Sequence, residues 1–297
     1  MSETHLNFTE KPSNAMAMVK ALVLPRAGFK TEIGLPNLQA HWHDATVNAG
    51  ELKDYFATLE IKPTDYLPIS YPHVMAGTMC MNMLANKVFP IRLLGALHLK
   101  NRIVQNRPIQ ASEAVDIDIR VGDYRLTDNG VEFDFVTDVT VASELVWQET
   151  SIYLVRGNFG GKKNPSVNKS FELTSLTEAT VTNEWHIPKS RGREYAKISG
   201  DYNPIHMSPW AAKMFGFKRD IAHGFGVMAQ AIDFSNAMVD VDDGKAVQVD
   251  VVFKGPIFLG SDVSIRHNVV QDAQRYDVYC GENSRPNLCL AVKKLEK

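Results

Sequence analysis

The sequence predicts an α+β fold that contains one structural unit twice, a long buried helix followed by antiparallel strands. In each half, one stretch is apolar nearly all round, at residues 225–238 and at residues 74–84, which is the pattern of a buried helix. Each stretch is followed by strand patterns broken by a proline. Corresponding features lie about 148 to 150 residues apart, half of the 297-residue chain, which indicates an internal repeat.

The elements follow the same order in both halves. Segments in which apolar and polar residues alternate are typical of half-buried strands, and Asp128-Asn129-Gly130 is typical of a hairpin turn. In the first half we expect a helix at 74–84, entered at His73, and strands at 97–104 and 114–121. In the second half we expect a helix at 225–238, entered at His223-Gly224, and strands at 247–253 and 263–270.

A stretch rich in Gly, Lys, Asn and Ser separates the two halves. Residues 157–170 (GNFGGKKNPSVNKS) have almost nothing to bury, so we expect a linker. The predicted division is a first domain at 1–156, a linker at 157–180 and a second domain at 181–297. A helix wrapped by a curved sheet, present twice with the sheets side by side, is a double hot-dog arrangement. Two unrelated α+β domains with coinciding patterns are the alternative.

Composition excludes several classes of protein. With 32 basic and 34 acidic side chains, no basic field is available to hold nucleic acid or an anionic membrane. Three cysteines are too few and too irregularly spaced for a disulfide framework. No stretch approaches the roughly 20 apolar residues that cross a bilayer, and we expect a soluble, cytoplasmic protein. His41-Trp42-His43-Asp44 resembles a metal cluster but has no partner of ligand spacing nearby, so we expect a solvated loop and no metal.

The candidate chemistry lies in Ser199-Gly200-Asp201-Tyr202-Asn203-Pro204-Ile205-His206. Its turn-forming residues predict one tight loop, rather than a regular element, that carries both Asp201 and His206. Ser208 and Pro209 then begin a short helix that Gly216 closes. A carboxylate and an imidazole can activate water together, since one orients it while the other carries the proton. The alternative is that Asp201 only caps the turn and His206 is a core residue.

Gly224 lies at the predicted start of the second buried helix. Backbone N–H groups are unpaired there and the helix dipole favours negative charge. A thioester carbonyl could approach this glycine closely and gain enolate character during reaction, and one oxyanion donor is worth about 10²–10³ in rate. The alternative is that glycine is needed only because the helix packs tightly against the sheet.

Together, SGDYNPIH and the following GFKRDIAHGF, at 216–225, closely resemble the MaoC-like (R)-specific enoyl-CoA hydratases, also called hydratase 2, and the dehydratase domains of fatty-acid synthases. The strand pattern extends the resemblance over 181–297. It implies a double or dimeric hot-dog hydro-lyase that interconverts trans-2-enoyl and (R)-3-hydroxyacyl thioesters of CoA or acyl-carrier protein, without metal or cofactor, in fatty-acid metabolism. Asp201 and His206 would be the catalytic pair and the Gly224 N–H the oxyanion donor.

The resemblance also sets expectations for the remaining site. We expect Asn203 and His223 to contact substrate. The first half lacks the motif, since Leu52–Leu59 stands where the second Asp/His loop would fall, so one active site per chain is expected. The first half would then accommodate the acyl chain, with Met75 and Met79 lining an adaptable tunnel or simply packing in the core. A serine eight residues after the helix glycine is common in the family, and Ile232 stands there instead.

Two other functions remain open. A hot-dog thioesterase would activate water against the carbonyl carbon, which does not explain the paired His206. A non-catalytic acyl-thioester binding protein is favoured by Ile232 and disfavoured by the presence of both proton-transfer groups. A homodimer is compatible with the fold, although a duplicated hot-dog is complete as a monomer.

Overall fold

The structure is a computed structural model that describes residues 3–14, 17, 26–91, 96–160, 172–238 and 245–295. Its first half contains six strands and two helices among these residues. They are β1 (Thr4–Phe8), β2 (Leu38–Ala45), α2 (Ala49–Leu59), α3 (Tyr71–Ala85), β3 (Ala96–Gln105), β4 (Val115–Thr127), β5 (Gly130–Val141) and β6 (Glu144–Arg156).

The second half repeats this plan with shorter elements. Three short helices precede its long buried helix, α7. The elements are β7 (Thr180–Ile187), α4 (Arg191–Ser199), α5 (Pro204–Met207), α6 (Pro209–Met214), α7 (Gly224–Phe234), β8 (Val247–Phe253), β9 (Ser261–Val270), β10 (Ala273–Cys280) and β11 (Leu288–Lys294).

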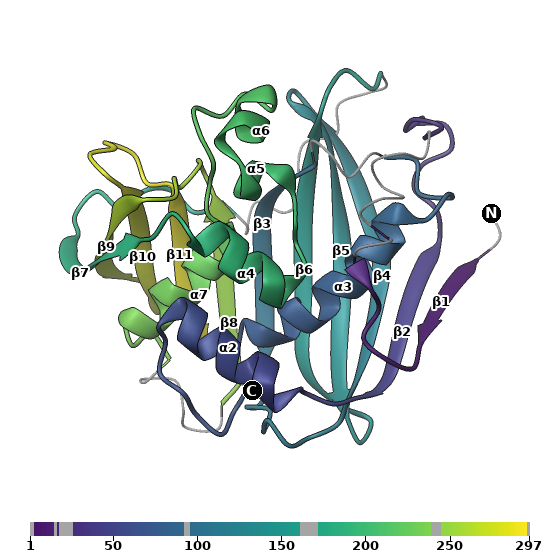
Figure 1. Ribbon diagram of the computed structural model, residues 1–297, viewed down its shortest axis with the longest axis horizontal. Coiled ribbons are helices and arrows are strands. Elements are labelled where there is room, and N and C mark those ends of the chain that lie inside the picture. Colours follow the sequence, from purple (N-terminus) through teal and green to yellow (C-terminus); the bar gives the residue numbers. More distant parts are fainter. Residues whose placement is uncertain are drawn as a thin grey trace.

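All the strands of the described residues form one sheet, in the order β1-β2-β4-β5-β6-β3-β8-β11-β10-β9-β7. Figure 1 shows the sheet curving behind the helices, with α3 in front of the first half and α7 in front of the second. The main core lies between these helices and the sheet, and its largest fully buried side chains include Trp147, Phe133 and Phe135. The predicted double hot-dog fold is confirmed.

The two halves join at the centre of the sheet, where β3 and β8 pair antiparallel. Arg102 faces Asp250 across this seam and binds it through two hydrogen bonds, of 2.6 Å and 2.9 Å. Gln248 donates a further bond of 2.7 Å to the same carboxylate. A two-pronged contact of this kind fixes the strand register as well as the charge balance. The halves therefore share one continuous sheet.

Most of the predicted elements are confirmed. Residues 247–253 form β8, the predicted strands at 97–104 and 263–270 lie within β3 and β9, and the one at 114–121 begins one residue before β4. The predicted hairpin turn joins β4 to β5. The predicted helix at 74–84 lies within α3. The prediction for 225–238 was wrong at its end, because α7 stops at Phe234: the Ser235 hydroxyl donates to the Ala231 carbonyl over 2.6 Å and Asn236 adopts a φ of 51°.

Two segments differ from expectation in kind. Leu52–Leu59 lies within helix α2, which precedes the long helix as α4 does in the second half, so it is not the counterpart of the Asp/His loop. Of the predicted linker, residues 161–171 lie outside the described residues.

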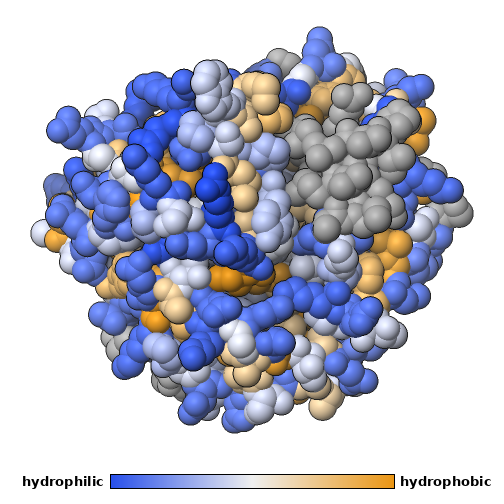
Figure 2. Space-filling view, viewed as in Figure 1, coloured by the Kyte–Doolittle hydropathy of each residue, from blue (hydrophilic) through white to orange (hydrophobic). Residues whose placement is uncertain are grey.

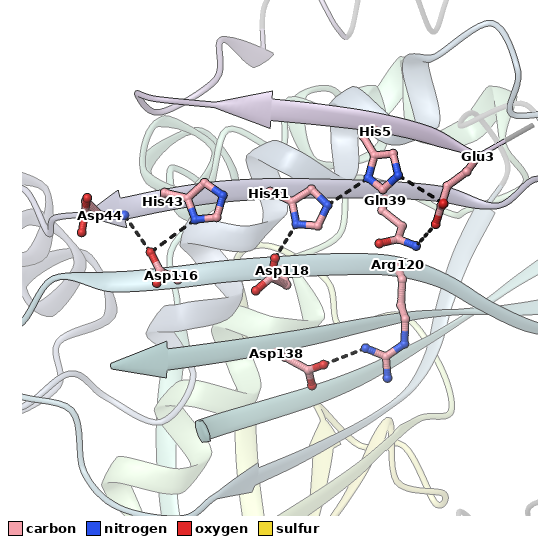
Figure 3. Close-up of polar contacts among 10 residues, drawn as sticks. All are labelled: Glu3, His5, Gln39, His41, His43, Asp44, Asp116, Asp118, Arg120 and Asp138. Carbon is pink, nitrogen blue, oxygen red and sulfur yellow. Dashed lines mark hydrogen bonds and ion pairs between the residues drawn. The ribbon is translucent and has the colours of Figure 1, made fainter. Parts of the chain in front are cut away.

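His41–Asp44 was predicted as a solvated loop, and this was wrong: it belongs to β2. Trp42 is 6% exposed and packs in the core, while His41 and His43 point to the outer face. There His41 Nε2 lies 3.2 Å from His5 Nδ1 on β1, and its other ring nitrogen contacts Asp118 on β4 (Figure 3). Strands on both sides pair with His41 and Trp42, and a bulge follows in which Asp44 adopts a φ of 51°.

One face of the molecule is mostly hydrophilic, and Figure 2 shows that hydrophobic side chains gather on it only in small groups. Among the described residues, none of the helices has the length and apolar character needed to span a membrane.

Candidate active site

The turn after α4 positions Asp201. Gly200 ends the helix in a left-handed conformation, with a φ of 73°. The Asn203 N–H donates to Asp201 Oδ1 over 3.1 Å, so this oxygen stabilises the turn. The second oxygen, Oδ2, lies 3.8 Å from His206 Nε2 and 3.9 Å from His223 Nε2. Asp201 therefore both caps the turn and faces two imidazole rings.

His206 lies on the one-turn helix α5 and not on an irregular loop, which corrects that part of the sequence prediction. Pro204 begins the helix, and the Asn203 side chain accepts the Ile205 N–H over 3.4 Å as its N-cap. Helix α4 crosses close behind: a Cβ at Gly192 would lie 2.2 Å from the His206 carbonyl oxygen. Glycine at 192 is thus required for His206 to occupy this place.

Hydrogen bonding sets the tautomer of His206. Its Nδ1 lies 2.8 Å from the Ile221 carbonyl, which can only accept, so Nδ1 carries the proton. The lone pair of Nε2 then faces Asp201. Burial lowers the pKa of His206, against the opposing effects of the Asp201 charge and the bond to Ile221. The ring is therefore a neutral base with its acceptor nitrogen directed at the carboxylate.

His223 ties the turn to helix α7. Its ring stacks on His206, with centroids 3.7 Å apart, and its Nε2 donates to the Asp201 carbonyl over 2.9 Å. Burial, and then repulsion from His206, lower the pKa of His223 to about 3, so it stays neutral. His223 therefore helps to position the Asp201 turn, and its contact with substrate stays a prediction.

Helix α7 begins beside these rings, at Gly224. The His223 carbonyl accepts the first helical bond, from the Val227 N–H, which leaves the N–H of Gly224 without a partner inside the helix. A Cβ at Gly224 would lie 2.8 Å from the Phe253 ring. Tight packing therefore explains why the residue is glycine, and its N–H lies at the positive end of the helix dipole.

The other residues singled out in the sequence lie in the core or at the end of a helix. Met79 is fully buried and Met75 is 6% exposed, and both belong to the main core cluster. Ile232 is buried on α7, and Ser235 caps the end of that helix, so it does not replace the family's supporting serine. Gly192 and the Ile221 carbonyl were missed, because nothing local in the sequence marks a contact between separate segments.

Asp201, His206 and His223 bring their ligand atoms within 4.8 Å of one another, so metal binding must be considered. The bond from His223 Nε2 to the Asp201 carbonyl makes this nitrogen a donor, and the Nδ1 of His206 is occupied by Ile221. A cation would therefore meet only two free ligand atoms, fewer than a zinc site requires. The arrangement fits acid–base chemistry better.

A pocket of about 490 Å³ opens elsewhere, between α2 and Ala111, and none of the three residues that face one another at the Asp201 turn lines it. The turn is the better candidate because a carboxylate, a neutral histidine and a helix N-terminus meet there. The volume of a pocket by itself does not indicate a reaction.

A duplicated helix-and-sheet fold with a carboxylate and histidine beside a helix N-terminus defines an acid–base site suited to a substrate with a carbonyl group. Residues 170–285 match the MaoC like domain. The 3-hydroxyacyl-thioester dehydratase X of Mycobacterium tuberculosis is 30% identical over 227 residues, which are 76% of this chain and 78% of that protein. The chain belongs to the MaoC-like dehydratase family.

Two further comparisons agree. The enoyl-CoA hydratase ChsH3 of the same organism is 26% identical over 260 residues, covering 81% of this chain and 87% of that protein. The crystal structure of HtdX of M. tuberculosis superposes with a TM-score of 0.73 at 25% identity, covering 86% of this chain and 100% of that one.

Proposed function

We propose that this protein is a hydro-lyase that interconverts trans-2-enoyl thioesters and (R)-3-hydroxyacyl thioesters in fatty-acid metabolism. The observation that carries the proposal is the approach of Asp201 Oδ2 to the unprotonated Nε2 of His206, at 3.8 Å, beside the N-terminus of α7. The names of the two mycobacterial relatives, a dehydratase and a hydratase, support both directions of this reaction.

The geometry leaves room for one shared water. An oxygen atom about 2.8 Å from each group, an ordinary hydrogen-bond length, can bridge Asp201 Oδ2 and His206 Nε2. Asp201 orients this water and His206 accepts a proton from it as the oxygen bonds to C3 of the enoyl thioester. The thioester carbonyl becomes an enolate, whose charge the Gly224 N–H stabilises. His206 then returns the proton to C2, so that H and OH have been added across the double bond.

The two halves are assigned different roles in this proposal. Residues 181–297 supply the catalytic groups, residues 157–180 are the linker, and residues 1–156 accommodate the acyl chain. Asn203 and His223 contact the thioester, and the acyl chain runs along helix α3, which carries Met75 and Met79 in its core-facing part. The substrate is carried by CoA or acyl-carrier protein. A measurement of molecular mass in solution distinguishes a homodimer from a monomer.

The test is hydration of crotonyl-CoA and trans-2-octenoyl-CoA, followed by loss of enoyl-thioester absorbance and by chiral analysis of the product. Asp201→Asn and His206→Ala are each expected to lower kcat/KM by about 10²–10⁴. His186→Ala is the matched control, because His186 also pairs with a carboxylate, Asp262, at 2.7 Å, but on the exposed surface. It should keep full activity.

Each alternative has its own product. Release of free CoA without a 3-hydroxy product would indicate a thioesterase. Binding without any conversion, with CoA and with carrier-protein thioesters alike, would indicate an acyl-thioester binding protein and overturn the proposal.

A further inference from the structure

One face of α3 is partly accessible, although most of the helix is buried. His73, Gly77, Cys80 and Met81, spaced as one helical face, are all partly accessible, whereas Met75 and Met79 are packed in the core. Gly77 faces the end of α4, since a Cβ there would lie 4.0 Å from the Ser199 carbonyl, two residues before Asp201. Under the proposed function, an acyl chain that extends from a thioester at Gly224 would run along this face of α3.

His73 stands at the start of this face. Its ring stacks on Phe225, the residue after Gly224, with centroids 3.6 Å apart and planes 14° apart. Its Nδ1 lies 2.7 Å from Oε1 of Glu149 on β6, so Nδ1 carries the proton. The second nitrogen, Nε2, remains on a side chain that is 18% exposed. This nitrogen thus belongs to a ring that packs against the residue after Gly224, the proposed oxyanion donor.

Behind His73 lies a buried polar network that an alkyl chain does not need. Glu149 is 2% exposed, and Asn101 Nδ2 donates to it over 2.5 Å and to Ser151 Oγ over 2.9 Å. Asn101 is fully buried and its Oδ1 has no hydrogen-bond partner among the described residues. Burying such groups is unfavourable unless they are satisfied, so their presence beside an acyl path calls for a reason.

The network and the catalytic turn are close in space. Burial, followed by the electrostatic effects of Cys80 and of the Glu149 and Asp201 carboxylates, raises the pKa of Tyr153, whose ring stacks on His98 at 4.7 Å. The His98 ring stacks in turn 5.8 Å from His73, and its Nε2 is buried without a partner among the described residues. The Glu149 and Asp201 carboxylates therefore both lie near the Tyr153 ring.

We propose that His73, held by Glu149, hydrogen-bonds a hydroxyl group on the acyl chain, so that the substrates are enoyl thioesters hydroxylated beyond C3. This inference rests on the proposed function and names its substrate class. A hydroxyl fits because it donates to Nε2 when the ring is neutral and accepts from it when the ring is charged, whereas a ketone only accepts. A carboxylate on the chain would be repelled by Glu149 and Asp201.

The experiment compares kcat/KM for trans-2-octenoyl-CoA with that for its 5-, 6- and 7-hydroxy derivatives. An unhydroxylated chain leaves His73 Nε2 desolvated and unpaired, so at least one hydroxy derivative should be preferred by about 10-fold or more. The double variant His73→Phe/Glu149→Gln keeps the ring stack on Phe225 and removes the charge, and should bring the preference within about 2-fold. His267→Phe, at another stacked histidine, on β9, is the control and should keep it.

Calorimetric binding of octanoyl-CoA and the corresponding hydroxyoctanoyl-CoA esters separates the two proposals. Hydration of all four substrates at equal kcat/KM would overturn the hydroxyl site and leave the proposed function standing. Absence of hydration with tighter binding of one hydroxy ester would support the site and overturn the function. Equal binding without hydration would overturn both.

Discussion

Replacing Gly192 with alanine tests whether the backbone of α4 positions the catalytic histidine. The new Cβ would lie 2.2 Å from the His206 carbonyl oxygen, and contacts below 3.0 Å essentially do not occur, so the two backbones must separate by about 0.8 Å. The same Cβ would lie 2.9 Å from Leu259 Cδ1, which blocks a retreat in that direction.

The expected effect is a loss of catalytic rate in a protein that remains folded. A 1 Å misplacement of a catalytic group can lower the rate by about 10², whereas overpacking costs about 1–3 kcal/mol of unfolding free energy. We therefore expect Gly192→Ala to remain folded and to lose about 10²-fold in kcat/KM for enoyl-CoA hydration.

The assay is steady-state hydration together with a thermal unfolding scan. Gly255→Ala is the matched control, because its Cβ would meet Asn287 Nδ2 at an ordinary 3.4 Å. A Gly192→Ala protein with wild-type kcat/KM would refute the argument that this contact places His206. Loss of folding in Gly192→Ala would show instead that the contact is mainly structural.

Three further predictions follow from the same structure. Burial lowers the pKa of His206, and the neutral form of this histidine is the proposed base. The value of kcat/KM should therefore fall as the pH drops through a value below the ordinary 6.5. A pH–rate profile in which this fall occurs above pH 6.5 would contradict the prediction. Met79→Ala should cost about 2–5 kcal/mol of unfolding free energy in urea, and a changed chain-length preference without loss of stability would favour the tunnel role instead. Arg102→Met should cost about 3–5 kcal/mol of unfolding free energy, because the Asp250 carboxylate at the central seam would keep its bond from Gln248 but lose its cation. Arg102→Met/Asp250→Leu should recover most of this in the same urea assay; equal stability of the single variant and wild type would refute it.

The sequence by itself determined the features that depend on neighbours along the chain. The apolar run before the proline at 256 predicted β8 to the residue, and the apolar stretch at 74–84 predicted most of α3, because these patterns follow from local backbone period and burial. The spacing of Asp201 and His206 within eight residues was enough to expect them at one place.

Tertiary structure decided what depends on segments far apart. His41–Asp44 became part of a strand because β1 and β4 pair with His41 and Trp42 from both sides, which no local propensity encodes. The end of α7 depended on capping at Ser235 and Asn236. The contact of His73 with Phe225 and Glu149 joins three elements from both halves, and the tautomer of His206 depends on the Ile221 carbonyl fifteen residues away. Side chains acquire such partners only when the chain is folded, because local sequence sets the conformation of each segment and packing sets which segments meet.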